Sequence, residues 1–162
     1  MMQPTMGNSN YSYNSNKFRA ISGFYSKSND SFDSFKKYPD SQWFASKQEL
    51  EVYKELISLP DVIVQRQVKV PIKLPTPHYD ATSWKCDFLI TQAHCPKKQF
   101  LVEAKGMPTR EFKLMLQYLE YFNHIDWRRI VIVAQKRFKV DEYFWTIPTD
   151  EIAEYLSCQW MK

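Results

Sequence analysis

Two carboxylates and one lysine stand on two short apolar segments of this chain. Asp87 lies in the run WKCDFLI, and Glu103 and Lys105 lie in the run FLVEAKG. Both runs have the length and composition of β-strands. Residues two apart in a strand share one face, so Glu103 and Lys105 point the same way, and a hairpin between the strands would bring Asp87 beside them.

Core packing gives no reason to group these charges, because an unpaired charge on a buried sheet loses its hydration. Metal-assisted hydrolysis does give a reason: two hard oxygen ligands hold a divalent ion, and a lysine activates water or steadies a pentavalent phosphate. The alternative is structural, with Glu103 and Lys105 on a solvated strand face and Asp87 capping a turn. The coincidence of all three residues favours a metal-dependent hydrolase.

The pattern resembles the signature of the PD-(D/E)XK nucleases, in which an aspartate is followed one strand later by Glu-x-Lys. This superfamily includes restriction enzymes, Holliday-junction resolvases and RecB-like nucleases. The segment FASKQE at positions 44–49 resembles the opening of small phage-encoded members, and Gln117 to Tyr121 resembles the Q-x-x-x-Y of RecB-like members. One difference is Cys86, which stands where the name-giving proline would be.

The resemblance covers residues 44–135 and implies an α/β fold with a restriction-endonuclease-like αβββαβ core, a mixed central sheet flanked by helices. It also implies a ligand set: Asp87 and Glu103 would hold Mg²⁺, or Mn²⁺ as a substitute, together with the backbone carbonyl of Ala104. Lys105 would be the catalytic lysine.

Glu49 has two interpretations. Its position three residues after Ser46 is the spacing of a helix capping box, so it would cap its own helix. The resemblance instead implies a catalytic role, in which this first-helix glutamate approaches the metal as an extra ligand or orients a water. Lys47, in the same segment, is expected to contact DNA.

Lys113, Gln117 and Tyr121 recur every four residues and form one polar stripe on a predicted helix. The stripe either faces solvent or turns toward the site. In the second case Gln117 would take part in catalysis by orienting Lys105 or a water, and Lys113 and Tyr121 would contact DNA.

The composition changes near residue 40. Residues 1–40 contain no glutamate, are rich in Asn and Ser, and carry scattered aromatic residues. We expect a flexible N-terminal arm that stacks on nucleic-acid bases, packs on a neighbouring subunit, or forms a loosely attached tail. Residues 41–162 are expected to form the nuclease domain.

Periodicity in this second region predicts a helix over 46–59, strands over 62–73, 84–90 and 100–106, a helix over 109–124, a buried strand over 129–135 and a short helix over 150–156. The first strand is expected to be irregular near Arg66 and Gln67, and Pro96 to lie in a turn. The first helix is expected to bury Leu50, Tyr53, Leu56 and Ile57.

Composition excludes several other classes of protein. No apolar run is long enough to span a bilayer, and the start lacks the apolar stretch of a secretory signal. Three scattered cysteines suggest reduced thiols, and only three glycines leave no glycine-rich phosphate loop. The net charge of +4 is compatible with a polyanionic partner.

We therefore interpret the sequence as a Mg²⁺-dependent endodeoxyribonuclease of phage or mobile-element origin, acting in the cytoplasm of a bacterial or phage-infected cell. A homodimer is expected, because the resembling family often dimerises to cut both strands. The alternatives are a strand-cleaving subunit of a multi-subunit transposase, a homing endonuclease on the same fold, and a non-catalytic nucleic-acid-binding module. Branched, site-specific duplex and single-stranded DNA all remain open as substrates.

Overall fold

The computed structural model describes residues 22–73, 82–142 and 144–160. Its elements, in chain order, are β1 (Gly23–Ser26), β2 (Ser31–Asp33), β3 (Gln42–Phe44), α1 (Lys47–Ser58), β4 (Val62–Ile72), β5 (Thr82–Gln92), β6 (Cys95–Ala104), α2 (Arg110–Tyr121), the 3-10 helix η2 (Trp127–Arg129), β7 (Ile130–Ala134), β8 (Thr146–Pro148), the 3-10 helix η3 (Thr149–Glu151) and α3 (Ile152–Trp160). From α1 to β7 the order is helix, three strands, helix and strand, as predicted.

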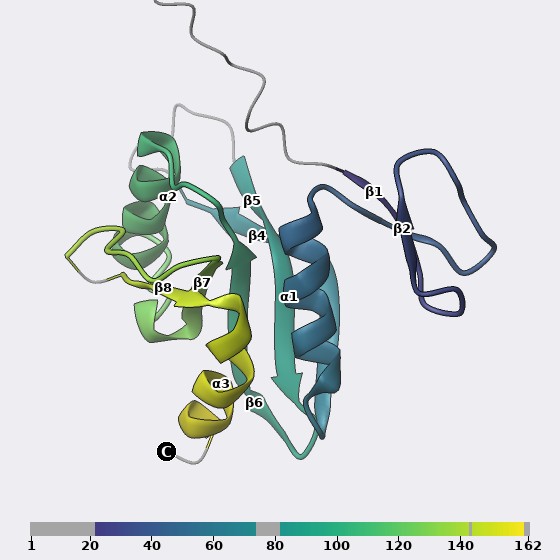
Figure 1. The fold of residues 1–162 in the computed structure, drawn as a ribbon. Coiled ribbons are helices and arrows are strands. Elements are labelled where there is room, and N and C mark those ends of the chain that lie inside the picture. The colour runs from purple at the N-terminus through teal and green to yellow at the C-terminus, as the bar shows by residue number, and fades with distance from the viewer. Residues whose placement is uncertain (1–21, 74–81, 143, 161–162) are drawn as a thin grey trace, which may run out of the picture.

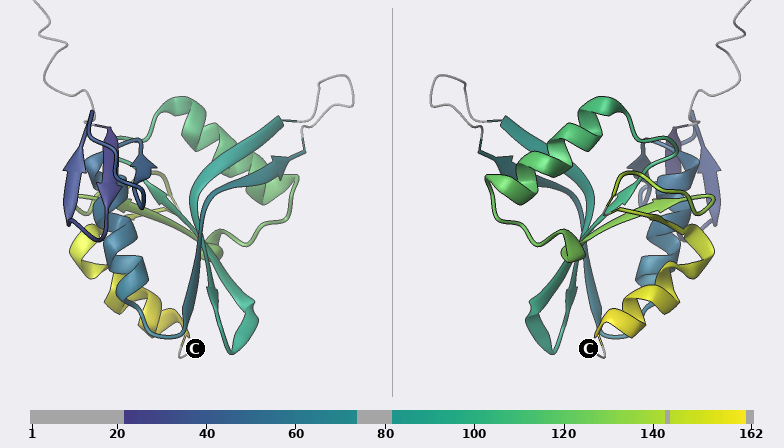
Figure 2. Two further views of the ribbon diagram at one scale, coloured as in Figure 1. Left: turned by 90° about the vertical axis from the view of Figure 1, so that its right-hand side faces the viewer. Right: turned by 90° about the vertical axis from the view of Figure 1, so that its left-hand side faces the viewer.

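A five-stranded mixed sheet with the order β4-β5-β6-β7-β8 forms the centre of this α/β fold. The strands β4, β5 and β6 are antiparallel, whereas β7 adds parallel to β6 and β8 parallel to β7. Helices α1 and α3 cover one face of the sheet and α2 covers the other (Figures 1 and 2). All five residues of β7 are buried, because helices cover this strand on both faces.

Each helical layer encloses its own hydrophobic core. On one face α1 contributes Val52 and Leu56, which pack with α3 and the sheet. On the other face α2 contributes Phe112, Leu116 and Leu119. The predicted apolar side of α1 was partly wrong, since Val52 is fully buried and Ile57 is exposed. The buried stripe runs through Val52 and Leu56, which lie four residues apart on one side of the helix, and Ile57 falls outside it.

The paired strands β4 and β5 serve both cores. Even-numbered residues at one end pack beneath α1 and α3, and even-numbered residues at the other end pack against α2: Val62, Val64, Phe88 and Ile90 in the first set, Val70, Ile72, Trp84 and Cys86 in the second. Residues of one parity share one side of a strand, so the pair must bend between the two sets. Both strands curve strongly along their length in Figure 2.

The bend lies at Gln67, which has a positive φ of 53°. Arg66 pairs with Phe88 and Val68 pairs with Cys86, so Gln67 and Asp87 face each other where the ladder is interrupted. The irregularity predicted near Arg66 and Gln67 is confirmed. It places Asp87 at the point where the sheet passes from one core to the other.

Residues 23–44 contain a second sheet, of order β2-β1-β3, in a region where no strand was predicted. Tyr25 and Phe44 pack from this sheet onto Leu50 of α1. Its strands have three or four residues, too few for a two-residue period to be recognised. The expected boundary near residue 40 falls between β2 and β3, and residues 1–21 of the expected arm lie outside the described residues.

Two smaller expectations also differ from the structure. Pro96 is the second residue of β6 and not part of the turn, a position near a strand start where the missing N–H of proline is tolerated. The short strand β8 was not predicted.

None of the helices in the described ranges has the length and apolar character needed to cross a membrane.

Candidate active site

The β5–β6 hairpin brings Asp87 and Glu103 together. Phe88 pairs with Val102, so the next position along places Asp87 opposite Glu103. The Asp87 N–H donates to Glu103 Oε2 (3.3 Å), and the Ala104 N–H donates to Asp87 Oδ2 (2.9 Å). The backbone therefore holds both carboxylates at one place, as the spacing of the two apolar runs predicts.

Lys105 follows directly after β6 and points to the same place. Its Nζ lies 3.7 Å from Glu103 Oε1 and 4.9 Å from the centre of the Phe112 ring in the first turn of α2. Its N–H donates to the Val133 carbonyl of β7 (2.8 Å), which fixes the backbone beyond the strand end. With its side chain 32% exposed, Lys105 combines a buried partner with access to solvent.

Glu49 caps its helix as predicted, but its carboxylate accepts from the residue before the N-cap Ser46 and not from the N-cap N–H itself. The Glu49 N–H donates to Ser46 Oγ (3.0 Å), and the Ala45 N–H donates to Glu49 Oε2 (2.9 Å). The other carboxylate oxygen, Oε1, accepts from Gln67 Nε2 at 3.0 Å and from Arg66 at 3.4 Å. Glu49 is only 2% exposed, so one oxygen completes the helix cap while the other faces β4.

Two residues of β4 that had no predicted role connect Glu49 to its surroundings. Gln67 Nε2 reaches Asp87 Oδ1 as well (3.4 Å). Arg66 donates to the Trp43 carbonyl and packs its guanidinium 3.7 Å from the centre of the Phe44 ring, which ties the small sheet to the site. The only sequence signal for this pair was the irregularity predicted at their position.

The electrostatics of the hairpin oppose ionisation of its carboxyl groups. Burial raises the pKa of Glu103 to about 8, and the charge of Asp87 adds to that rise. Burial also raises the pKa of Asp87 to about 6, with a further contribution from Glu49. Lys105 acts in the opposite direction on both groups. Two carboxylates in a desolvated place with one partial counter-charge form a site that would gain from a further cation.

Cys86, next to Asp87, shows no sign of a nucleophile. It is fully buried, and its Sγ lies 3.4 Å from the carbonyl oxygens of both Phe88 and Val102. Burial raises the pKa of its thiol well above the usual range. A thiol that stays protonated is a core residue and does not attack a substrate.

The donor chemistry of Asp87 and Glu103 fits a hard divalent cation. Mg²⁺ is commonly held by one or two carboxylates, with water and substrate oxygens completing its shell. Within the described part of the chain, the only contacts of Asp87 Oδ1 and Glu103 Oε1 are the long ones of 3.4 Å and 3.7 Å given above. In the described ranges no three His, Cys, Asp or Glu side chains form a group able to hold a metal ion. A cation here would thus depend on these two carboxylates and on oxygens other than side-chain carboxylates.

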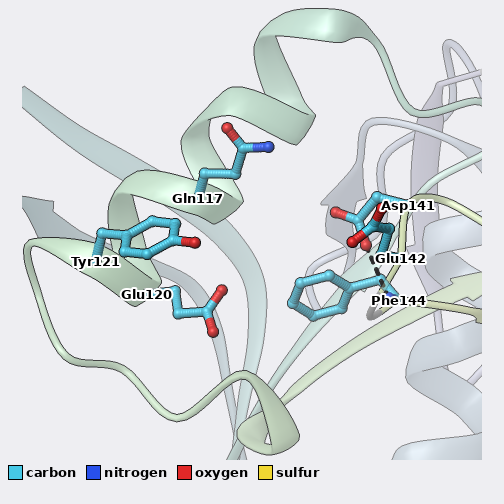
Figure 3. Close-up of a pocket in the computed structure, with 6 residues that line it drawn as sticks. All are labelled: Gln117, Glu120, Tyr121, Asp141, Glu142 and Phe144. Atoms are coloured by element: carbon cyan, nitrogen blue, oxygen red, sulfur yellow. Dashed lines mark hydrogen bonds between the residues drawn. The ribbon is translucent and has the colours of Figure 1, made fainter.

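The remaining predicted site residues form no hydrogen bond or ion pair with Asp87 or Glu103 among the residues that the structure describes. Lys47 is exposed at the first position of α1, and Lys113 is half-buried on α2. Gln117 and Tyr121 line a pocket of about 350 Å³ between α2 and the segment before β8 (Figure 3), together with Glu120, Asp141, Glu142 and Phe144. Within the part of the chain that the structure describes, Gln117 makes no hydrogen bond to Lys105. The three acidic residues of this pocket disfavour a phosphate there.

No family model, no curated protein and no solved structure matches this chain.

Proposed function

We propose that the protein is a metal-dependent endodeoxyribonuclease built on a restriction-endonuclease-like core. The observation that carries this proposal is the convergence of Asp87, Glu103 and Lys105 on the bent β5–β6 hairpin, where burial raises the pKa of both carboxyl groups. Ionisable groups with strongly shifted pKa values cluster at functional sites. The order helix, three strands, helix and strand supports the same proposal.

In this proposal the two carboxylates bind the metal ion and the lysine acts on the water and the phosphate. Asp87 and Glu103, with the Ala104 carbonyl, would hold Mg²⁺ or Mn²⁺, which when bound supplies a Lewis acid for water and phosphate. Lys105 orients the attacking water and offsets negative charge on the phosphate as it becomes pentavalent. Its contact with Glu103 keeps the ammonium at the site, and the adjacent Phe112 ring limits its freedom.

A nucleic-acid substrate is favoured by the net charge of +4. Phosphate contacts by lysine and arginine would provide most of the affinity, so binding should weaken steeply as salt increases. Dimerisation would let two such sites act on the two strands of a duplex. A phage or mobile element remains our expectation for the origin of the chain.

A nicking assay on supercoiled plasmid tests the proposal. Mg²⁺, Mn²⁺ and Ca²⁺ should all bind, because the ligands are hard oxygen atoms. Mg²⁺ and Mn²⁺ should support cleavage, and Ca²⁺ should support little, because its larger and more flexible coordination shell fixes the reacting groups less well. Asp87→Asn, Glu103→Gln and Lys105→Met should each lose cleavage. Glu51→Gln on the exposed side of α1 and Lys97→Met at the far end of the hairpin are matched controls that should retain it.

Two results would contradict the proposal. Robust cutting in excess EDTA would exclude the metal route. Binding of DNA without cleavage under any divalent ion would favour the alternative of a non-catalytic nucleic-acid-binding module. Single-stranded and branched DNA tested in parallel would define the substrate structure.

A further inference from the structure

Gln67 is the side chain that joins two carboxylates from different elements. Its Nε2 lies 3.0 Å from Glu49 Oε1 on α1 and 3.4 Å from Asp87 Oδ1 on β5. An amide NH₂ group has two donors, which is the number needed for two carboxylate acceptors. Glu49 is 18 residues and Asp87 is 20 residues away from Gln67 in sequence, so both hydrogen bonds are tertiary contacts.

The backbone at Gln67 is unusual for a glutamine within a strand. Its φ of 53° is in the left-handed region, which costs a residue with a side chain on the order of 1 kcal/mol. Such a conformation persists where the surrounding structure determines it, and it is often found at functional sites. At this position it interrupts the ladder opposite Asp87.

Arg66 contacts the same oxygen of Glu49 as Gln67 does. Its Nη2 lies 3.4 Å from Glu49 Oε1, and the same guanidinium donates to Trp43 and to Gln42 of β3. Glu49 Oε2 is already used by the Ala45 N–H. Both oxygens of Glu49 therefore have protein donors, and among the described residues the Gln67 amide is the hydrogen-bonded link between Glu49 and Asp87.

We propose that Gln67 is a positioning residue: its amide holds the Asp87 carboxylate in place for a divalent cation and links it to Glu49, which acts on the site through its charge and this hydrogen bond and not as a metal ligand. The inference rests on the proposed function for its catalytic consequence. Hydrogen-bonded partners of ligating carboxylates typically change metal affinity or activity by about tenfold to a hundredfold. An effect of that size separates this role from a contact that only supports the fold.

Two substitutions at Gln67 test the proposal. Gln67→Met keeps an unbranched side chain of similar length and the same backbone strain but removes both donors. Gln67→Asn keeps the amide and suits a positive φ, yet it is one methylene too short to reach both carboxylates. Gln65→Met is the matched control, on an exposed residue of the same strand.

The primary measurement is Mg²⁺ affinity by calorimetry on the full chain without DNA, together with kcat at saturating Mg²⁺. We expect both Gln67 variants to bind Mg²⁺ about tenfold more weakly and to have a lower kcat, while Gln65→Met matches the wild type. A folded Gln67→Met with wild-type Mg²⁺ affinity and kcat would overturn the proposal. A fully active Gln67→Asn would also overturn it, because bridging would then be unnecessary.

The design separates this proposal from the proposed function. If wild-type protein binds Mg²⁺ but cleaves no DNA, and Gln67→Met weakens that binding, then positioning stands and the nuclease function fails. If wild-type protein cleaves DNA and the Gln67 variants bind and cleave normally, then the nuclease function stands and positioning fails. Loss of Tm in Gln67→Met with unchanged Mg²⁺ affinity of the folded protein would assign Gln67 to the fold alone.

Discussion

Asp40 in the small sheet region and Asp87 in the central hairpin both accept backbone hydrogen bonds, yet the pKa of Asp40 is lowered and the pKa of Asp87 is raised. Asp40 is exposed and accepts from the Ser28 N–H and from the hydroxyls of Ser26 and Ser28, and these bonds lower its pKa to about 2. Asp87 accepts from Ala104, but its burial and the nearby Glu49 raise its pKa. Hydrogen bonding dominates in the first region and desolvation dominates in the second.

The difference separates a carboxylate whose charge stabilises the folded state from carboxylates whose charge destabilises it. Asp40 is stabilised as an anion by three donors, so its charge contributes to the structure of residues 26–40. Glu103 is 6% exposed, with the Asp87 N–H and Lys105 as its partners, so its charge costs stability. Groups kept at a cost to the fold are candidates for function.

The largest expected effect is on DNA cleavage, which substitutions of Asp87 and Glu103 should reduce without lowering the stability of the protein. Asp87→Asn and Glu103→Gln should each reduce cleavage at least about a hundredfold, because each removes an anionic oxygen donor. The Tm of the metal-free protein should be unchanged or higher, since repulsion between the carboxylates is relieved. Asp40→Asn should do the reverse, with normal cleavage and a lower Tm. Wild-type turnover in either hairpin variant would show that the wrong cluster has been identified.

The second prediction concerns pH in the presence of EDTA. Because the pKa of Glu103 is raised above its unfolded value of 4.5, the folded state binds the proton more tightly, and stability falls as pH rises from about 4.5 to about 8. The loss should be on the order of a few kcal/mol. Urea unfolding across this pH range measures it.

Glu103→Gln provides the control for this pH dependence. Glutamine does not titrate, so the variant should show a flatter stability profile over the same range. Added Mg²⁺ should restore wild-type stability at the alkaline end, since a ligand that binds only the folded state stabilises it. A wild-type profile that rises steadily with pH in EDTA would contradict the sign of the Glu103 shift.

The third prediction separates the capping role of Glu49 from its influence on the site. Glu49→Gln keeps an acceptor for the Ala45 N–H, so stability should change little. It removes the charge that faces Arg66 and Gln67, so cleavage at limiting Mg²⁺ should fall about tenfold and recover in part at higher Mg²⁺. Glu51→Gln, two residues along the same helix, should behave as wild type. Unchanged cleavage across the Mg²⁺ titration would leave Glu49 as a cap only.

The meeting of Asp87 and Glu103 could be predicted from sequence because it depends on local rules. A two-residue period sets the face of Glu103 and Lys105, and adjacent strands of a hairpin set the partner. The main helices and β7 were predictable for the same reason, since the capping spacing at Ser46, the apolar period of the helices and the continuous apolar run of β7 mark them directly.

The contacts of Gln67 and Arg66 could not be predicted in this way. They require a left-handed residue in a strand, an aromatic ring of the small sheet and a helix carboxylate to meet across distant segments. The expected turn of Gln117 toward Lys105 likewise depends on the rotation of α2. That rotation is set by the burial of Phe112, Leu116 and Leu119, and it leaves Gln117 exposed.

The smallest expected effect tests the structural side of the comparison, at Asp40. A pKa lowered from 3.8 to about 2 means that the folded state holds the carboxylate more tightly than the unfolded chain does. Its contribution to stability is therefore complete above about pH 4 and is lost as pH falls through about 2. Asp40→Asn should lower the Tm only slightly at neutral pH, because an amide accepts from Ser26 and Ser28 less strongly than a carboxylate and solvent screens an exposed charge. The difference between variant and wild type should then shrink as the pH is lowered below 4, measured by thermal unfolding of both proteins in parallel. A difference that stays constant down to pH 2 would mean that the Asp40 charge contributes nothing to the small sheet region, and the contrast with Asp87 and Glu103 would rest on the hairpin alone.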